Sequence, residues 1–160
     1  MGARLAFTLP SRVVVSLGKQ LYYHPKFRGV LLARTILVAD EDNDTRIILR
    51  TVLERHQFVV VEAATADDAF NATQVQAFDL IILNYPMPAP DGRTLVRRLR
   101  AVATTRQVPI LNLTSRVVPQ FLQEAAEEGV SLTLPKPIDI ENVINVVNEL
   151  ISAHSTALIG

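Results

Sequence analysis

The sequence predicts an α/β domain built on a doubly wound, five-stranded parallel sheet with five helices. From Thr35 onward, short aliphatic runs alternate with segments in which apolar residues recur at helical spacing. Runs of this kind are typical of strands buried on both faces of a parallel sheet. Right-handed crossovers between such strands place helices on both faces of the sheet.

Five aliphatic runs are the candidate strands, and each is three to six residues long. In order they are Thr35–Ala39, Phe58–Val61, Leu80–Leu83, Val108–Leu113 and Leu132–Leu134. The carboxyl ends of parallel strands meet at one edge of the sheet, where ligands bind in this architecture. The residues that follow these runs are therefore the first candidates for a functional site.

The segments between the runs carry helix signals. Arg46–Leu53 places apolar residues at i, i+4 spacing, and Thr65 with Asp68 forms a pair that resembles a capping box. Pro119 suits a first helical turn, and Gly129 suits a C-terminal stop. Two further helices are indicated by apolar stripes: Leu95, Val96, Leu99 and Val102, and then Ile140, Val143, Ile144, Val147, Leu150 and Ile151. We expect Ile140, Val143, Ile144, Val147 and Ile151 of the second stripe to face the sheet.

The composition is that of a globular protein, with 49% hydrophobic and 20% charged residues. No apolar run is long enough to span a membrane. Cysteine is absent, which excludes disulfides, thiolate metal ligands and cysteine nucleophiles and agrees with the cytoplasmic location that we expect. The net charge of zero conceals an asymmetry, because residues 1–34 contain six basic and no acidic residues. The remaining residues contain ten basic and sixteen acidic ones, so a basic extension precedes an acidic domain.

We expect three parts in the chain. Residues 1–34 form a basic N-terminal extension that is flexible or reflects a misassigned start, the true start then lying near Val30. Residues 35–153 form the domain, and residues 154–160 form a C-terminal tail. Because the chain ends soon after the last predicted helix, we expect no attached output domain. An alternative role for residues 1–34 is a basic arm that docks on a membrane or on nucleic acid.

Polar residues follow four of the runs: Asp40, Glu41 and Asp42, then Asn84, Thr114 and Lys136. Carboxylates are the ligands that Mg²⁺ prefers, whereas a hydroxyl and an ammonium group suit phosphoryl oxygens. Lys136 is the only lysine after residue 34, where the nine other basic residues are all arginine. This bias indicates a position that needs a compact ammonium group rather than a planar guanidinium.

Four motifs resemble those of the bacterial response-regulator receiver domain, which has the CheY-like (flavodoxin-like) fold. They are "ILVADED" (36–42), "FDLIILNYPMPAPDG" (78–92), "VPILNLTS" (108–115) and "LPKPI" (134–138), and the resemblance extends from about Thr35 to Ile151. It implies a role in two-component signal transduction or a phosphorelay. It also implies a signalling partner, which would be a histidine kinase or another receiver or output protein.

The resemblance implies roles for particular residues. Asp40 and Glu41 match the acidic pair that holds Mg²⁺ in the family. Thr114 matches the hydroxyl that orients towards the phosphoryl group, and Lys136 matches the ammonium group that bonds to the phosphoryl oxygens. These residues together imply a phosphoryl site at the strand ends.

Two positions depart from the family pattern. Asn84 matches the aspartate that such domains phosphorylate, but an amide has neither the charge nor the nucleophilic lone pair of a carboxylate. Losing this acid also leaves at most weak Mg²⁺ binding. Thr133 matches an aromatic residue that moves with the phosphorylation state, and threonine lacks the ring. The acceptor and the moving part of the switch are both missing.

We therefore expect a stand-alone, degenerate receiver that is not an enzyme, requires no cofactor and acts as a phosphorylation-independent interaction module. Its docking face would be the last helix–strand–helix unit. Through this face it would pair with a second copy of itself or with another signalling protein, and we expect no binding of nucleic acid. This face comprises Pro119–Gly129, Leu132–Leu134 and Ile140–Ile151. The alternative is a functional phosphoacceptor that uses a nearby acid such as Asp42.

Overall fold

The computed structural model describes residues 15–17, 20–22, 33–87 and 92–157, with side chains from Ala33 onward. The chain divides into two compact units, Met1–Leu32 and Ala33–Gly160. In the first unit, β1 (Val15–Leu17) and β2 (Gln20–Tyr22) pair in antiparallel fashion. Most of the predicted flexible extension, like the basic-arm alternative, lies outside the described residues.

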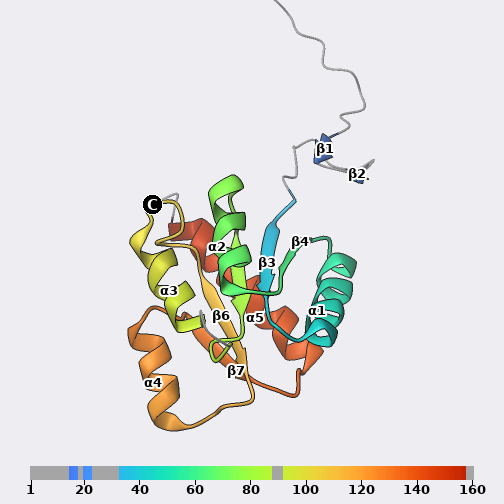
Figure 1. Cartoon of the computed structure of the whole chain (residues 1–160). Helices are drawn as coiled ribbons and strands as arrows, with labels where there is room; N and C mark the ends of the chain where they lie inside the picture. Colours follow the sequence, from blue (N-terminus) through green and yellow to red (C-terminus); the bar gives the residue numbers. More distant parts are fainter. Residues whose placement is uncertain (1–14, 18–19, 23–32, 88–91, 158–160) are drawn as a thin grey trace, which may run out of the picture. The chain divides into compact units, whose positions relative to one another are not determined.

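The sheet of the second unit has five parallel strands in the order β4-β3-β5-β6-β7 (Figure 1). The strands are β3 (Thr35–Ala39), β4 (Val59–Ala63), β5 (Leu80–Leu83), β6 (Ile110–Thr114) and β7 (Leu132–Pro135). All five predicted strands are confirmed, and none of their ends moves by more than two residues. The strand order reverses direction at β3, so β3 and β5 flank the switch point where ligands bind in doubly wound sheets.

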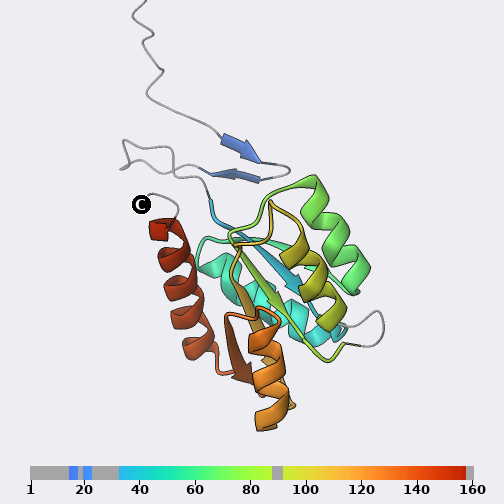
Figure 2. The same ribbon diagram turned by 90° about the vertical axis from the view of Figure 1, so that its left-hand side faces the viewer.

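Five helices alternate with these strands (Figures 1 and 2). They are α1 (Asn43–Arg55), α2 (Ala66–Val75), α3 (Gly92–Ala101), α4 (Pro119–Glu127) and α5 (Ile140–Ala157). Thr65 caps α2 as predicted, because its hydroxyl accepts the Asp68 N–H at 3.1 Å. Pro119 opens α4 as predicted, and Gly129 lies just beyond its end with a φ of 108°.

Two hydrophobic cores hold the helices on the sheet. Alternate residues of each strand point to opposite faces. Leu37 and Ala39 therefore face the core under α2, α3 and α4, whereas Ile36 and Val38 face the core under α1 and α5. Within the described residues, no helix is both long and apolar enough to cross a membrane. The doubly wound α/β class is confirmed.

Several details differ from the sequence prediction. α5 continues to Ala157, so residues 154–157 belong to this helix and not to a tail. Arg34 donates to Asp79 at 2.6 Å and thus belongs to the domain rather than to the extension. Ile140 is 47% exposed, because it begins α5 beyond the edge of the core. Leu132 is 39% exposed because β7 is an edge strand, so β7 is not buried on both faces.

Candidate functional site

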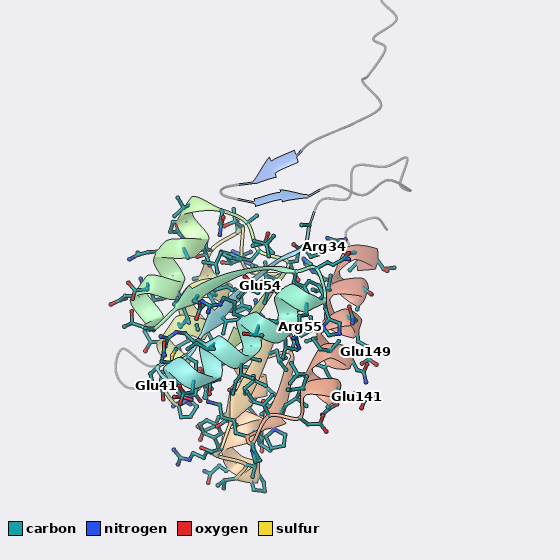
Figure 3. All side chains as sticks on the ribbon, turned by 90° about the vertical axis from the view of Figure 1, so that its right-hand side faces the viewer. Arg34, Glu41, Glu54, Arg55, Glu141 and Glu149 are labelled. Carbon is teal, nitrogen blue, oxygen red and sulfur yellow. The ribbon has the colours of Figure 1, made fainter. Side chains whose placement is uncertain are left out.

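The carboxyl ends of four strands bring the predicted site residues to one edge of the sheet. Asp40 follows β3, Asn84 follows β5, Thr114 ends β6, and Lys136 follows β7. The backbone N–H of Lys136 donates to the carbonyl of Thr114 at 2.8 Å, which fixes the last two strand ends relative to each other. Glu41 lies next to Asp40 at the N-terminal end of α1 (Figure 3).

Asp40 and Lys136 form an ion pair inside this site. The Asp40 residue is only 2% exposed, and its Oδ2 accepts a hydrogen bond from the Lys136 Nζ at 2.7 Å. Its Oδ1 accepts the backbone N–H of Asp42 at 2.9 Å. A buried carboxylate is costly unless it is paired and hydrogen-bonded, and here both oxygens are used. This need for a compact cation accounts for the isolated lysine in an arginine-rich segment.

Asn84 is held against Glu41 through its amide nitrogen. Its Nδ2 donates to both carboxylate oxygens of Glu41, at 3.0 and 3.1 Å. An ionised carboxylate can only accept hydrogen bonds, so the amide must turn its NH₂ group towards Glu41. The Asn84 residue is 8% exposed, and its Oδ1 is buried and accepts no hydrogen bond within the described part of the chain. The Asn84 amide therefore donates hydrogen bonds to Glu41, while its own Oδ1 remains without a donor among the described residues.

The oxygens around this pocket are of the type that Mg²⁺ binds. Asn84 contacts the Glu41 carboxylate through its Nδ2, and its buried Oδ1 accepts no hydrogen bond within the described residues. An amide oxygen, like a carboxylate, is an accepted ligand for hard cations. Both carboxylates, however, already have donors in Lys136 and Asn84. No cluster of three or more metal-ligating acids or histidines occurs among the residues that the structure describes. These residues fit a weakly held cation.

Thr114 is fully buried at the end of β6, and its hydroxyl oxygen accepts the backbone N–H of Arg116 at 2.9 Å. This bond fixes the side chain that the resemblance assigns to a phosphoryl group. Arg46, from α1, donates to the carbonyls of Asp40 and Glu41 at 2.7 and 3.2 Å and so holds the acidic turn. Arg46 was not among the site residues predicted from the sequence.

Asp42 is used differently from its two acidic neighbours. It is the N-cap of α1, and its Oδ2 accepts hydrogen bonds from the hydroxyl and the backbone N–H of Thr45, at 2.5 and 3.0 Å. The bond from the Thr45 hydroxyl is the main reason why the pKa of Asp42 lies below its usual range. Its carboxylate is thus committed to the start of the helix.

The turn that follows Asn84 is fixed by residues that sequence analysis missed. The backbone N–H of Tyr85 donates to Oδ1 of Asn112 at 2.9 Å, and the Tyr85 hydroxyl donates to Glu128 at 2.9 Å. Burial, followed by the hydrogen bond to Glu128, raises the pKa of Tyr85 to about 12. The one available sequence signal was the polar Asn112 within the apolar run of β6.

Thr133 lies opposite Asn112 in the register of β6 and β7. Its hydroxyl oxygen accepts a hydrogen bond from Nδ2 of Asn112 at 3.3 Å. Thr133 is half-buried, so the position that the resemblance matches to a mobile aromatic residue is occupied here by a small side chain with a polar partner.

The family model for the response regulator receiver domain matches residues 36–148. The chain belongs to the response regulator receiver family. Among solved structures, the receiver CheY4 of Vibrio cholerae superposes with a TM-score of 0.71 at 26% identity, over 74% of this chain and 98% of that one. A response regulator from Chloroflexus aurantiacus superposes with the same TM-score, 0.71, at 27% identity, covering 75% of this chain and 98% of that chain.

Relatives in sequence differ in length. A 14.6 kDa protein from Leptolyngbya boryana is 32% identical over 71% of this chain and 87% of its own length. The phosphate regulon transcriptional regulatory protein PhoB of Escherichia coli is 29% identical over 71% of this chain, but the match covers 49% of PhoB. The receiver domain therefore spans about half the length of that regulator.

Gly92 is expected to be essential for the geometry of the turn after Asn84. A Cβ at this position would lie 2.6 Å from the carbonyl oxygens of both Asn84 and Tyr85. Because these are backbone atoms, Gly92→Ala should shift the turn and destabilise the domain by about 1–3 kcal/mol in denaturant unfolding. Without this contact, Gly→Ala in a helix would stabilise by roughly 0.5–1 kcal/mol. A stabilised variant would therefore contradict this account of the turn.

Proposed function

We propose that this receiver is a phosphorylation-independent interaction module of a two-component signalling system. One observation carries the proposal: the side chain at the acceptor position, Asn84, directs its NH₂ group at Glu41. An amide in this orientation presents hydrogen-bond donors where the chemistry needs a nucleophilic oxygen. Its remaining atom, Oδ1, is a neutral amide oxygen with no charge to drive attack on phosphorus.

The charges of the pocket support the same conclusion. Lys136 neutralises Asp40 at 2.7 Å, and Asn84 satisfies Glu41. The two interactions hold the pocket together through side chains of the chain itself. Asp40 and Glu41 would hold Mg²⁺, which would supply the positive charge that phosphoryl transfer requires. We propose that such binding is weak and that the module requires no cofactor.

The alternative acceptor, Asp42, is disfavoured by its hydrogen bonds. Its carboxylate caps α1 through Thr45. Phosphorylation at Oδ2 would remove the cap and destabilise the start of α1. The lowered pKa of Asp42, caused first by the Thr45 hydroxyl, also reflects an oxygen that is already stabilised as a hydrogen-bond acceptor.

We propose that the docking face consists of α4, β7 and α5. On α5, Val143, Ile144, Val147 and Ile151 are buried against the sheet. Glu141 and Glu149 project from the same helix into solvent (Figure 3). Leu132, 39% exposed on the edge strand, adds apolar area to this face. A partner would be another signalling protein or a second copy of this chain, and we expect no nucleic acid there because the face carries acidic groups.

The acceptor chemistry is tested with a small-molecule phosphodonor. We expect no gain of a phosphoryl group by the wild-type protein after incubation with acetyl phosphate and Mg²⁺, measured by intact mass. Asn84→Asp should gain a base-labile phosphoryl group, because Asp40, Glu41, Thr114 and Lys136 remain in place. Asn145→Asp, which adds a carboxylate on the exposed side of α5, is the matched control and should gain none.

Stable labelling of the wild-type protein at residues 40–44 or at residue 84 would overturn the proposal. If Asn84→Asp folds and takes up no phosphoryl group, the rest of the site does not support acceptor chemistry either.

The docking face is tested by charge reversal. Glu149→Lys on α5 and Glu127→Lys on α4 should each weaken self-association measured by sedimentation, because both acids are exposed on the proposed face. Glu54→Lys on α1 makes the same change outside the face and should have no effect. Equal weakening by all three variants would indicate a general charge effect, and loss of association only with Glu54→Lys would place the interface on α1.

A further inference from the structure

We propose that Asn112 is a positioning residue that fixes the Asn84–Tyr85 turn and, through Tyr85, the helix α4. Hydrogen bonds link four residues in a row: Thr133, Asn112, Tyr85 and Glu128. We call this chain of hydrogen bonds the tie. The inference rests on the proposed function only in one respect, namely that α4 belongs to the docking face. The tie would then set the conformation of that face from inside the domain.

Asn112 is unusual for its place in the fold. It is fully buried in β6, a strand whose other buried residues are mostly aliphatic. Its amide satisfies two partners on different segments, because Oδ1 accepts from the Tyr85 N–H at 2.9 Å and Nδ2 donates to Thr133 at 3.3 Å. A buried amide that lost these partners would be destabilising. Asn112 therefore specifies how the turn after β5 and the edge strand β7 sit on β6.

Tyr85 carries the tie to α4 at two points. Its hydroxyl donates to Glu128 at 2.9 Å, immediately beyond the end of the helix. Its ring meets the Phe121 ring edge-on, with 5.1 Å between the centroids. Phe121 and Glu128 are seven residues apart, so they lie on the same side of the helix, two turns from each other. Tyr85 thus contacts both ends of the inner side of α4.

Glu128 is anchored from a third element. Arg93 and Arg97 of α3 donate to its Oε1 at 2.8 and 2.6 Å. Burial would raise the pKa of Glu128, but the hydrogen bonds from Tyr85, Arg97 and Arg93 together hold it below its usual range. The carboxylate is therefore ionised at neutral pH and is a strong acceptor for the Tyr85 hydroxyl.

α4 buries few apolar side chains against the rest of the domain. Ala125 is the only fully buried residue of α4, whereas each of the other four helices of the domain buries at least three. The N-cap of α4, Val118, provides no side-chain hydrogen bond. A helix that buries one small side chain has low local stability. Polar contacts then hold α4 to the domain, from Tyr85 on one side and from Arg93 and Arg97 of α3 on the other. The first of these depends on the position of Tyr85 and therefore on Asn112.

The experiment compares variants by amide hydrogen exchange and by titration of the Tyr85 hydroxyl. Asn112→Leu keeps a side chain of similar length and removes the acceptor of the Tyr85 N–H. We expect exchange in residues 119–127 to accelerate at least tenfold while α1 (Asn43–Arg55) remains unchanged. The pKa of Tyr85, about 12 in the wild type, should fall towards the ordinary value of 10.0. The titration is followed by the absorbance of tyrosinate, and the titration curve of Tyr85→Phe is subtracted to remove the contribution of the other tyrosines.

If Asn112→Leu does not fold, two milder variants at Thr133 test the same hydrogen bonds. Thr133→Val keeps the shape and loses the hydroxyl, whereas Thr133→Ser keeps the hydroxyl. The proposal predicts a smaller change in the same direction for Thr133→Val and wild-type behaviour for Thr133→Ser. Thr73→Val is the matched control, since Thr73 is a buried threonine of α2 whose hydroxyl donates to the Phe70 carbonyl.

Unchanged exchange of α4 together with an unchanged Tyr85 pKa in Asn112→Leu, or in Thr133→Val if the former is unfolded, would overturn the proposal. Faster exchange throughout the domain, α1 included, would also overturn it, because that result indicates a general core defect. Neither readout involves a phosphodonor, so failure of the tie is distinguishable from failure of the proposed function.

Discussion

The buried carboxylate of Asp40 must be paired with a cation. The other polar side chains at the strand ends are arranged around the ion pair that it forms with Lys136. Lys136 reaches the carboxylate from the far edge of the sheet at 2.7 Å, across the ends of β3, β5, β6 and β7. A buried ion pair is not in itself strongly stabilising, but losing one partner costs about 3–5 kcal/mol. The pair therefore fixes which side chains can occupy the space between the strand ends.

Asn84 occupies that space. With an aspartate at this position, three acids would share the pocket with one lysine, and a divalent cation would relieve their repulsion. With Asn84, the amide NH₂ group bonds to Glu41 at 3.0 and 3.1 Å and the repulsion does not arise. We propose that these bonds hold the strand ends together without a metal ion or a phosphoryl group. The Oδ1 of Asn84 remains buried without a hydrogen-bond partner in the described part of the chain.

The fold was largely predictable because its signals are local. Strand runs, the Thr65 cap of α2 and Pro119 at the start of α4 each depend on a few neighbouring residues. The positions of Asp40 and Lys136 followed from the rule that parallel strand ends meet. The exposure of Ile140 was not predictable, since helical periodicity does not show where a helix extends past the sheet.

The contacts inside the site could not be predicted in the same way. Asn84 and Glu41 are 43 residues apart, as are Tyr85 and Glu128, and only the folded sheet brings them within hydrogen-bonding distance. Asn112 did carry a sequence signal, because a polar residue interrupts the aliphatic residues of β6. Its partners, a backbone N–H and the hydroxyl of Thr133, become apparent only from the strand register.

We propose that the Asn84 amide takes the place of a divalent cation in satisfying Glu41. Isothermal titration of Mg²⁺ into the wild-type protein and into Asn84→Asp measures whether the amide has replaced the cation. We predict that Asn84→Asp binds Mg²⁺ at least ten times more tightly, because the third carboxylate restores both the charge and the repulsion that a cation relieves. Equal affinities for Mg²⁺ in the two proteins would show that Asn84 does not substitute for the cation.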